Sequence, residues 1–140
     1  MTITLLKSKI HRATVTGASV DYEGSLTIAA DLADMVGLLP YERILVGNLA
    51  GGQRFETYVI LGAEGSGVIE LNGATAHRGK KGDRLTIMAF GQFDAREAAR
   101  HEPAVIVLGP GNAVVKSKPG IKPRRTTARK QAPGRSPTGR

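Results

Sequence analysis

The residues of this chain that could do chemistry are polar side chains scattered over short segments with a strand-like pattern. Lys9 and His11 are two residues apart, so in a strand they share a face. Arg54, Thr57 and Tyr58 fall together in another such segment. Each has an ordinary structural interpretation, because cations on strands are usually solvated and Tyr58 could be a core or rim aromatic. These side chains alone do not identify an enzyme.

Two turn-like stretches hold further polar residues. The stretch "DYEGSLTI" (21–28) is typical of a hairpin tip followed by a strand, with Gly24 and Ser25 at the bend. The stretch "NGATA" (72–76) begins with an Asn-Gly pair, which is a strong turn signal on its own. The local pattern gives no reason to prefer either turn as a reaction site.

The familiar catalytic and metal-binding motifs have little support. "GAEGSG" (62–67) could cradle a phosphate, but it lacks the lysine and the strand-to-helix context of a P-loop, so a loop is predicted. His11, His77 and His101 have no metal-ligand spacing. No Ser-His-Asp order or Gly-x-Ser-x-Gly elbow occurs. The chain has no cysteine, which excludes thiolate nucleophiles, disulfides and cysteine-based metal sites.

The fold that positions these residues is built by a chain of 140 residues. This length predicts a single domain with one modest core. Apolar residues make up 41% and aromatic residues only 4%, so the core must consist mainly of Val, Ile, Leu and Ala. The start "MTITLLKSKIHR" does not resemble a secretory signal. No stretch approaches the ~18 apolar residues of a membrane helix. We therefore expect a cytoplasmic protein with no membrane contact.

Charge is distributed unevenly along the chain. The net charge is +8, yet residues 116–140 hold nine Lys or Arg and no acid, which leaves residues 1–115 with a charge of −1. The segment 116–140 is rich in Pro, Gly, Ser and Thr, a composition that predicts a disordered basic tail. Such a tail could contact polyanions nonspecifically by releasing their counterions.

Alternating and β-branched patterns predict a mainly β fold. The strand candidates are 4–16, 25–30, 43–49, 54–61, 67–71, 84–90 and 104–108. Residues 50–53 supply a hairpin connection between two of them. Only two stretches look helical, and they begin at Asp31 and Asp94, each a plausible N-cap. Many short strands with tight turns indicate a compact β-barrel or sandwich.

Taken in order, "LLKSKIHRATVT", "YEGS", "RFETYVI", "GSGVIELNGATAH" and the Gly-Asp-x-Leu-x-Ile of 82–87 resemble the aspartate 1-decarboxylase family. This family contains pyruvoyl-dependent enzymes that make β-alanine for pantothenate and coenzyme A. The order and spacing match through about residue 95. The resemblance implies a small six-stranded double-psi β-barrel with short helices in residues 1–115, assembled as a homotetramer, with the tail 116–140 outside the barrel.

The resemblance also implies a cofactor made from the chain itself. α-Decarboxylation needs an electron sink that no natural side chain provides. A covalent pyruvoyl group derived from Ser25 would supply it, without pyridoxal phosphate or metal. Self-cleavage between Gly24 and Ser25 would leave a β chain of residues 1–24 and an α chain of 25–140. Whether a maturation factor assists this cleavage stays open.

Further roles follow from the same resemblance. Arg54 and Lys9 would bind the two carboxylates of L-aspartate, since a guanidinium fork suits a carboxylate. Tyr58 would donate the proton that quenches the carbanion. Thr57 would hydrogen-bond the Gly24 carbonyl during self-cleavage and also contact substrate.

Five more positions complete the expected site, together with Asn72, which would polarise groups around the pyruvoyl. The backbone of Gly73 and Ala74 would contact substrate, while His11 and Tyr22 would line the pocket. The family commonly has "NGAAA" where this chain has "NGATA", which places Thr75 at a third substrate-contacting position. The Thr75 contact is either through the backbone or through a side chain that enters the pocket.

Two alternatives to an aspartate decarboxylase remain at this stage. One is a small β-barrel binding module whose basic tail engages nucleic acid. The other is a pyruvoyl decarboxylase with a shifted substrate preference, such as glutamate over aspartate, which pocket length would decide.

Overall fold

The computed structural model describes residues 1–120, which form nine strands and four short helices. The strands are β1 (Thr2–Thr14), β2 (Gly17–Ser19), β3 (Ser25–Ala29), β4 (Arg43–Asn48), β5 (Arg54–Gly62), β6 (Ile69–Asn72), β7 (Arg84–Asp94), β8 (Ala104–Leu108) and β9 (Val114–Lys118). The helices are α1 (Ala30–Met35) and α2 (Ala95–Arg100), with two 3₁₀ helices, η1 (Gly73–Arg78) and η2 (Pro110–Asn112). Each segment predicted as a strand forms one, so the mainly β class is confirmed.

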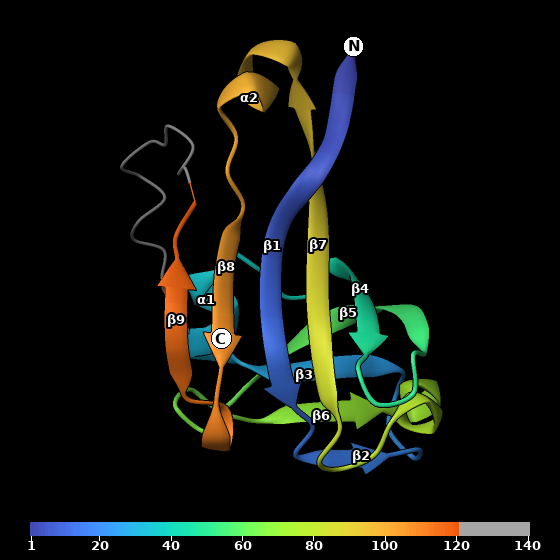
Figure 1. The fold of residues 1–140 in the computed structure, drawn as a ribbon. Coiled ribbons are helices and arrows are strands. Elements are labelled where there is room, and N and C mark those ends of the chain that lie inside the picture. The colour runs from blue at the N-terminus through green and yellow to red at the C-terminus, as the bar shows by residue number, and fades with distance from the viewer. Residues whose placement is uncertain (121–140) are drawn as a thin grey trace.

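The nine strands pair in the order β2-β6-β3-β5-β4-β7-β1-β8-β9. The long strands β1 and β7 are antiparallel, and β8 joins β1 in parallel. In Figure 1 these three strands are roughly vertical, with β1 and β8 pointing down and β7 pointing up, while β3 and β6 run across the view. The strands at one part of the sheet therefore run in a different direction from those at the other part. This is the arrangement of a sheet that curves around a core.

The core lies inside this curl and draws on both parts of the strand order. Ile10 of β1 and Ile87 of β7 are fully buried in the same cluster as Leu26 of β3 and Leu71 of β6. Burial of each such side chain contributes about 1.5–3 kcal/mol. One core enclosed by strands of two directions gives a β-barrel-like fold.

Two short strands and the end of the folded domain differ from expectation. The described residues form nine strands, seven of which were predicted, and the short strands β2 and β9 add to the two ends of the strand order. The six-stranded barrel that the resemblance implies stays a prediction. Lys116 and Lys118, expected in a disordered tail, belong to β9 and pair with Val107 and Val105 of β8. The open edge of β8 offers backbone hydrogen bonds that composition does not reveal. The rest of the expected tail, from residue 121 onward, lies outside the described residues.

The bend at Gly24 and Ser25 is present, but the predicted hairpin tip is wrong. Strand β6 lies between β2 and β3, running parallel to β2 and antiparallel to β3. The segment 20–24 therefore connects two strands that flank a third, instead of joining two paired strands. This places the bend beside the end of β6, where Asn72 and Gly73 lie.

One of the two predicted helix caps is confirmed and the other is wrong. Asp94 accepts a hydrogen bond from the Glu97 backbone N–H (2.8 Å), and the Asp94 N–H donates to the Glu97 carboxylate (2.9 Å), forming a capping box. Helix α1 begins at Ala30, and the Asp31 carboxylate instead accepts from the Gly65 N–H at 2.8 Å. None of the helices within residues 1–120 is long and apolar enough to cross a membrane.

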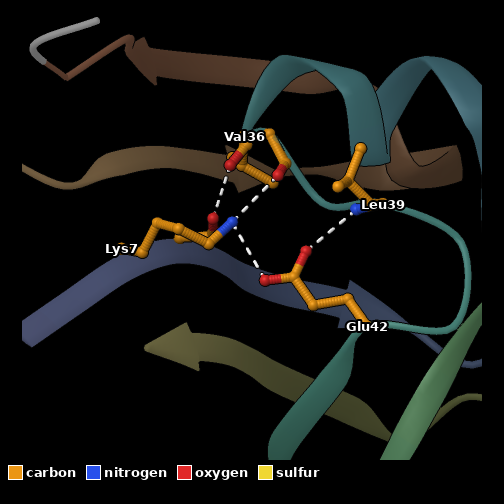
Figure 2. A network of polar contacts seen from close by, with 6 residues as sticks. Lys7, Val36, Leu39 and Glu42 are labelled. Atoms are coloured by element: carbon orange, nitrogen blue, oxygen red, sulfur yellow. Dashed lines mark hydrogen bonds and ion pairs between the residues drawn. The ribbon is translucent and has the colours of Figure 1, made fainter. Parts of the chain in front are cut away.

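A polar network fastens β1 to the connection between α1 and β4 (Figure 2). Lys7 Nζ lies 3.0 Å from a Glu42 carboxylate oxygen and donates to the Gly37 carbonyl at 2.9 Å. The other Glu42 carboxylate oxygen accepts from the Leu39 N–H at 2.9 Å. Because both charges keep contact with solvent, this pair contributes no more than about 1 kcal/mol. Its main effect is to fix the position of the connection.

Candidate active site

Ser25 is a buried serine that directly follows an exposed glycine. Ser25 begins β3 with only 3% of its surface exposed, and it pairs in register with Asn72 of β6. Gly24, immediately before it, lies in the exposed bend. The peptide bond at this junction joins an exposed glycine to a buried hydroxyl-bearing residue.

Asn72 holds the Ser25 hydroxyl from the neighbouring strand. The Asn72 side-chain amide nitrogen donates to Ser25 Oγ at 3.0 Å and to Thr27 Oγ1 at 2.8 Å. The Ser25 hydroxyl in turn donates toward the Glu23 carbonyl over a longer 3.4 Å. Asn72 is itself buried, with 6% exposed. The structure therefore brings two of the predicted site residues, Asn72 and Ser25, into direct contact.

Gly73 brings the start of η1 against the bend that contains Gly24. Its φ is +66°, a conformation that L side chains rarely adopt. A Cβ at position 73 would lie 2.5 Å from both the Gly24 nitrogen and the Tyr22 carbonyl oxygen. A Cβ at Gly24 would lie 3.9 Å from the Ala74 nitrogen. The backbone of Gly73 and Ala74 therefore lies beside Gly24, while the Tyr22 side chain is exposed.

Thr75 contacts Ser25 through its side chain. Its hydroxyl Oγ1 lies 3.0 Å from the Ser25 carbonyl oxygen and 2.7 Å from the Asn72 carbonyl oxygen, with the hydroxyl as donor. Thr75 is buried, with 7% exposed. The Thr75 side chain is thus directed at Ser25, while its expected contact with substrate stays a prediction. The sequence held no signal for the contact with Ser25, because it depends on the pairing of β3 with β6.

Thr57 and Tyr58 lie on β5, the strand on the other side of β3. The parallel pairing of Leu26 with Val59 places Tyr58 at the level of the start of β3. Tyr58 is half-buried, and its ring centroid lies 6.4 Å from that of Tyr41. Within residues 1–120, the side-chain hydrogen bonds that reach Ser25 come from Asn72 and Thr75, and no bond joins Thr57 to Gly24.

Arg54 and His11 lie in one row across the other part of the sheet. Arg54 of β5 pairs with Gly47 of β4, and Gly47 pairs with Thr86 of β7. The row ends at β1, where His11 Nδ1 is hydrogen-bonded to Thr86 Oγ1 at 3.1 Å. Directly paired residues share a face of a sheet, so Arg54 and Thr86 lie on the same face. The side-chain contact with Thr86 places His11 on that face as well.

Lys9 lies two residues before His11 on β1, in register with Met88 of β7, so it shares the face of His11 in a neighbouring row. The pKa of His11 is lowered, first by burial and then by the positive charges of Lys9 and Arg12. His11 is therefore neutral over a wider pH range than a free histidine. Within residues 1–120, no hydrogen bond or ion pair joins Lys9, His11 or Arg54 to the cluster around Ser25. Within these residues, the chain thus carries two groups of predicted site residues that no hydrogen bond or ion pair connects.

The carboxylates and histidines of the described residues do not gather into a metal site. No group of three or more His, Asp or Glu side chains in residues 1–120 is placed to hold an ion. The side chains that hydrogen-bond Ser25 within these residues are the amide of Asn72 and the hydroxyl of Thr75.

Comparison with known proteins connects this arrangement to one family. A family model described as aspartate decarboxylase matches residues 1–115. The chain belongs to the aspartate decarboxylase family. The match includes both groups of predicted site residues, those around Ser25 and those around His11.

Individual members of the aspartate decarboxylase family are similar over nearly their whole length. A protein named aspartate 1-decarboxylase from Thioalkalivibrio sulfidiphilus is 49% identical over 117 residues, covering 84% of this chain and 93% of the relative. One of the same name from Phenylobacterium zucineum is 46% identical over 117 residues, covering 84% and 99%. Another from Leptospira biflexa is 49% identical over 113 residues, covering 80% and 96%.

Proposed function

We propose that this chain decarboxylates L-aspartate to β-alanine and carbon dioxide, the step that supplies β-alanine for pantothenate and coenzyme A. Its family and the shared name of its relatives support the activity. The structural observation that carries the proposal is the buried Ser25 at the bend, with Asn72 at its hydroxyl and Thr75 at its carbonyl. The hydroxyl and the carbonyl of Ser25, the residue that would become the cofactor, therefore each accept a hydrogen bond.

Self-cleavage between Gly24 and Ser25 would form the pyruvoyl group. The Ser25 hydroxyl attacks the Gly24 carbonyl carbon, and the amide bond is exchanged for an ester. Elimination then breaks the Cβ–Oγ bond, releasing residues 1–24 with a carboxylate end, and hydrolysis of the resulting dehydroalanine liberates ammonia. Gly24 is exposed and has no Cβ to hinder the attack. The residues present therefore fit a group derived from Ser25.

The pyruvoyl group would supply a ketone that captures the substrate amine and withdraws electrons from the bond to carbon dioxide. The side chains would bind the substrate and supply the proton. Arg54 and Lys9 would neutralise the two substrate carboxylates, and Tyr58 would deliver a proton to the carbon that loses carbon dioxide. Thr57 lies next to Tyr58 on β5, where it would contact substrate.

Assembly into a homotetramer would unite the two groups of site residues. Lys9, His11 and Arg54 share a sheet face that makes no hydrogen bond or ion pair with the Ser25 cluster of the same chain within residues 1–120. Their proposed roles require them to reach the substrate bound at Ser25. We therefore assign this face to the Ser25 site of a neighbouring copy. Within each copy, the barrel-like fold would be the double-psi type that the resemblance implies.

A direct assay tests the substrate. The purified, matured protein is incubated with L-aspartate or with L-glutamate, and the amine product is identified by mass spectrometry. We expect β-alanine from aspartate and little product from glutamate, with none from the Ser25→Ala variant. Equal or faster turnover of glutamate would replace the proposed substrate. Absence of product from either amino acid would contradict the proposed activity. The alternative of a nucleic-acid-binding module gains no support from the comparisons.

A further inference from the structure

The Thr75 hydroxyl lies between two carbonyl groups, and one of them belongs to the residue that would be converted. Thr75 Oγ1 is 3.0 Å from the Ser25 carbonyl oxygen and 2.7 Å from the Asn72 carbonyl oxygen. A hydroxyl has one proton, so these two acceptors share it. The family pattern commonly has alanine at this position, so the donor is a feature of this chain rather than of the motif.

We propose that Thr75 accelerates the elimination step of self-cleavage by hydrogen-bonding the Ser25 carbonyl oxygen, an inference that rests on the proposed cleavage at Gly24-Ser25. In that step a base, such as water, takes the proton from the Ser25 Cα. The electron pair forms the Cα=Cβ bond while the Cβ–Oγ bond breaks. Oγ leaves as part of the Gly24 carboxylate, and residues 25 onward begin with dehydroalanine.

The charge that develops during this step explains why a donor at the Ser25 carbonyl matters. As the Cα proton leaves, negative charge spreads onto the adjacent carbonyl oxygen, as in an enolate. A hydrogen bond to an oxygen that gains charge becomes stronger, most of all at a site with little water. Thr75 is 7% exposed and Ser25 is 3% exposed, so water competes little there. The Thr75 hydroxyl would then turn its proton away from the Asn72 carbonyl oxygen and toward the Ser25 carbonyl oxygen.

Asn72 does not provide this donor in place of Thr75. Its side-chain amide has two N–H groups, and these point to Ser25 Oγ and Thr27 Oγ1. Among the side-chain hydrogen bonds of residues 1–120, only that of Thr75 reaches the Ser25 carbonyl. The two residues therefore have different roles. Asn72 positions the Ser25 hydroxyl for attack, and Thr75 contacts the Ser25 carbonyl, which gains charge during elimination.

A purely structural role for Thr75 makes a different prediction. Its bond to the Asn72 carbonyl, three residues earlier, would stabilise the start of η1 in any protein. Loss of that role would disturb ester formation and elimination alike, because Asn72 and Gly73 would shift together. Loss of the proposed donor would slow elimination and leave ester formation unchanged.

The test separates these two steps with hydroxylamine, which cleaves the ester as soon as it forms. Freshly made full-length precursor is compared with Thr75→Val, which keeps the shape without the hydroxyl, and Thr75→Ser, which keeps the hydroxyl. Thr75→Ala provides a second hydroxyl-free variant should Thr75→Val fold poorly. Spontaneous cleavage is followed by denaturing electrophoresis, and the mass of the α chain tells the two routes apart. The hydroxylamine product begins with an intact Ser25 and is heavier by one ammonia than the pyruvoyl product.

We expect spontaneous cleavage to slow about tenfold in Thr75→Val and Thr75→Ala, while hydroxylamine cleaves them at the rate of the unmodified chain. Thr75→Ser should cleave spontaneously at close to the unmodified rate. Unchanged spontaneous cleavage in the hydroxyl-free variants would overturn the inference. So would an equal slowing of both reactions, which would place the defect before the ester. An unmodified chain that cleaves by neither route would instead refute the proposed processing itself.

Discussion

Gly73 lies so close to Gly24 that a single added carbon would not fit between them. A Cβ at Gly73 would be 2.5 Å from the Gly24 nitrogen and 2.7 Å from its Cα. The Asn-Gly pair at 72–73 is thus more than a turn signal, because the glycine lets η1 pack against the bend before Ser25. The position of the proposed scissile bond depends on this contact.

Substitution of Gly73 by alanine tests this dependence. We expect Gly73→Ala to destabilise the fold by roughly 1–3 kcal/mol or more, through the positive φ and the displaced bend, and to block self-cleavage. Gly37→Ala is the matched control, because Gly37 has a φ of +75° with no atom within 4 Å of its Cβ position. Urea unfolding gives the stability of each variant and electrophoresis gives its cleavage. Normal cleavage in Gly73→Ala would show that the bend does not need this close approach.

Loss of the Asn72 amide should slow cleavage because the Ser25 hydroxyl loses its donor. Asn72→Ala leaves Ser25 Oγ and Thr27 Oγ1 without this partner, which should cost about 1–3 kcal/mol of stability. Thr27→Val removes the neighbouring contact alone and should cleave at nearly the unmodified rate. The measurement is the rate of appearance of the 25–140 chain. If Thr27→Val slows cleavage as much as Asn72→Ala, the contact with Ser25 is not the deciding one.

Replacement of Tyr58 by phenylalanine should separate maturation from turnover. The hydroxyl of Tyr58 makes no hydrogen bond with Ser25 within residues 1–120, so Tyr58→Phe should still cleave. Loss of the proposed proton donor should lower the rate of β-alanine formation by about 10²–10⁴-fold. Both quantities can be measured on one preparation. Full activity in the cleaved variant would remove Tyr58 from the proton transfer.

The lowered pKa of His11 predicts how stability changes with pH. The folded chain resists protonation of His11, whereas the unfolded chain takes up the proton near the ordinary value of about 6.5. The unfolded state therefore binds more protons between the two pKa values, and the contribution of His11 to stability falls as pH drops through this window. Lys9→Met should raise the pKa of His11, measured by NMR titration. An unchanged pKa would contradict the assigned contribution of Lys9.

Local interactions could be predicted from the sequence, whereas contacts between distant segments could not. The Asp94 cap was predictable because its partner, Glu97, lies three residues away. Asp31 was misassigned because its partner, Gly65, comes from a loop distant in the sequence. Strand β9 was missed because the edge of β8, rather than the composition of the segment, provides its pairing.

The candidate site shows the same limit. The family resemblance selected Ser25 and Asn72, and the structure places them in hydrogen-bond contact. The contact of Thr75 with the Ser25 carbonyl depends on how η1 folds back over the paired ends of β3 and β6. The positions of Lys9 and Arg54 relative to the Ser25 cluster depend on strand order, which the alternation of residues within each strand does not specify.

The most direct test of the central claim is the intact mass of the purified chain under denaturing conditions. We predict two polypeptides: residues 1–24 with a free carboxylate end, and residues 25–140 lighter by one ammonia than the same peptide with an intact Ser25. The Ser25→Ala variant should remain one chain. A full-length mass that persists after prolonged incubation, with β-alanine nevertheless produced from L-aspartate, would contradict a cofactor made from Ser25.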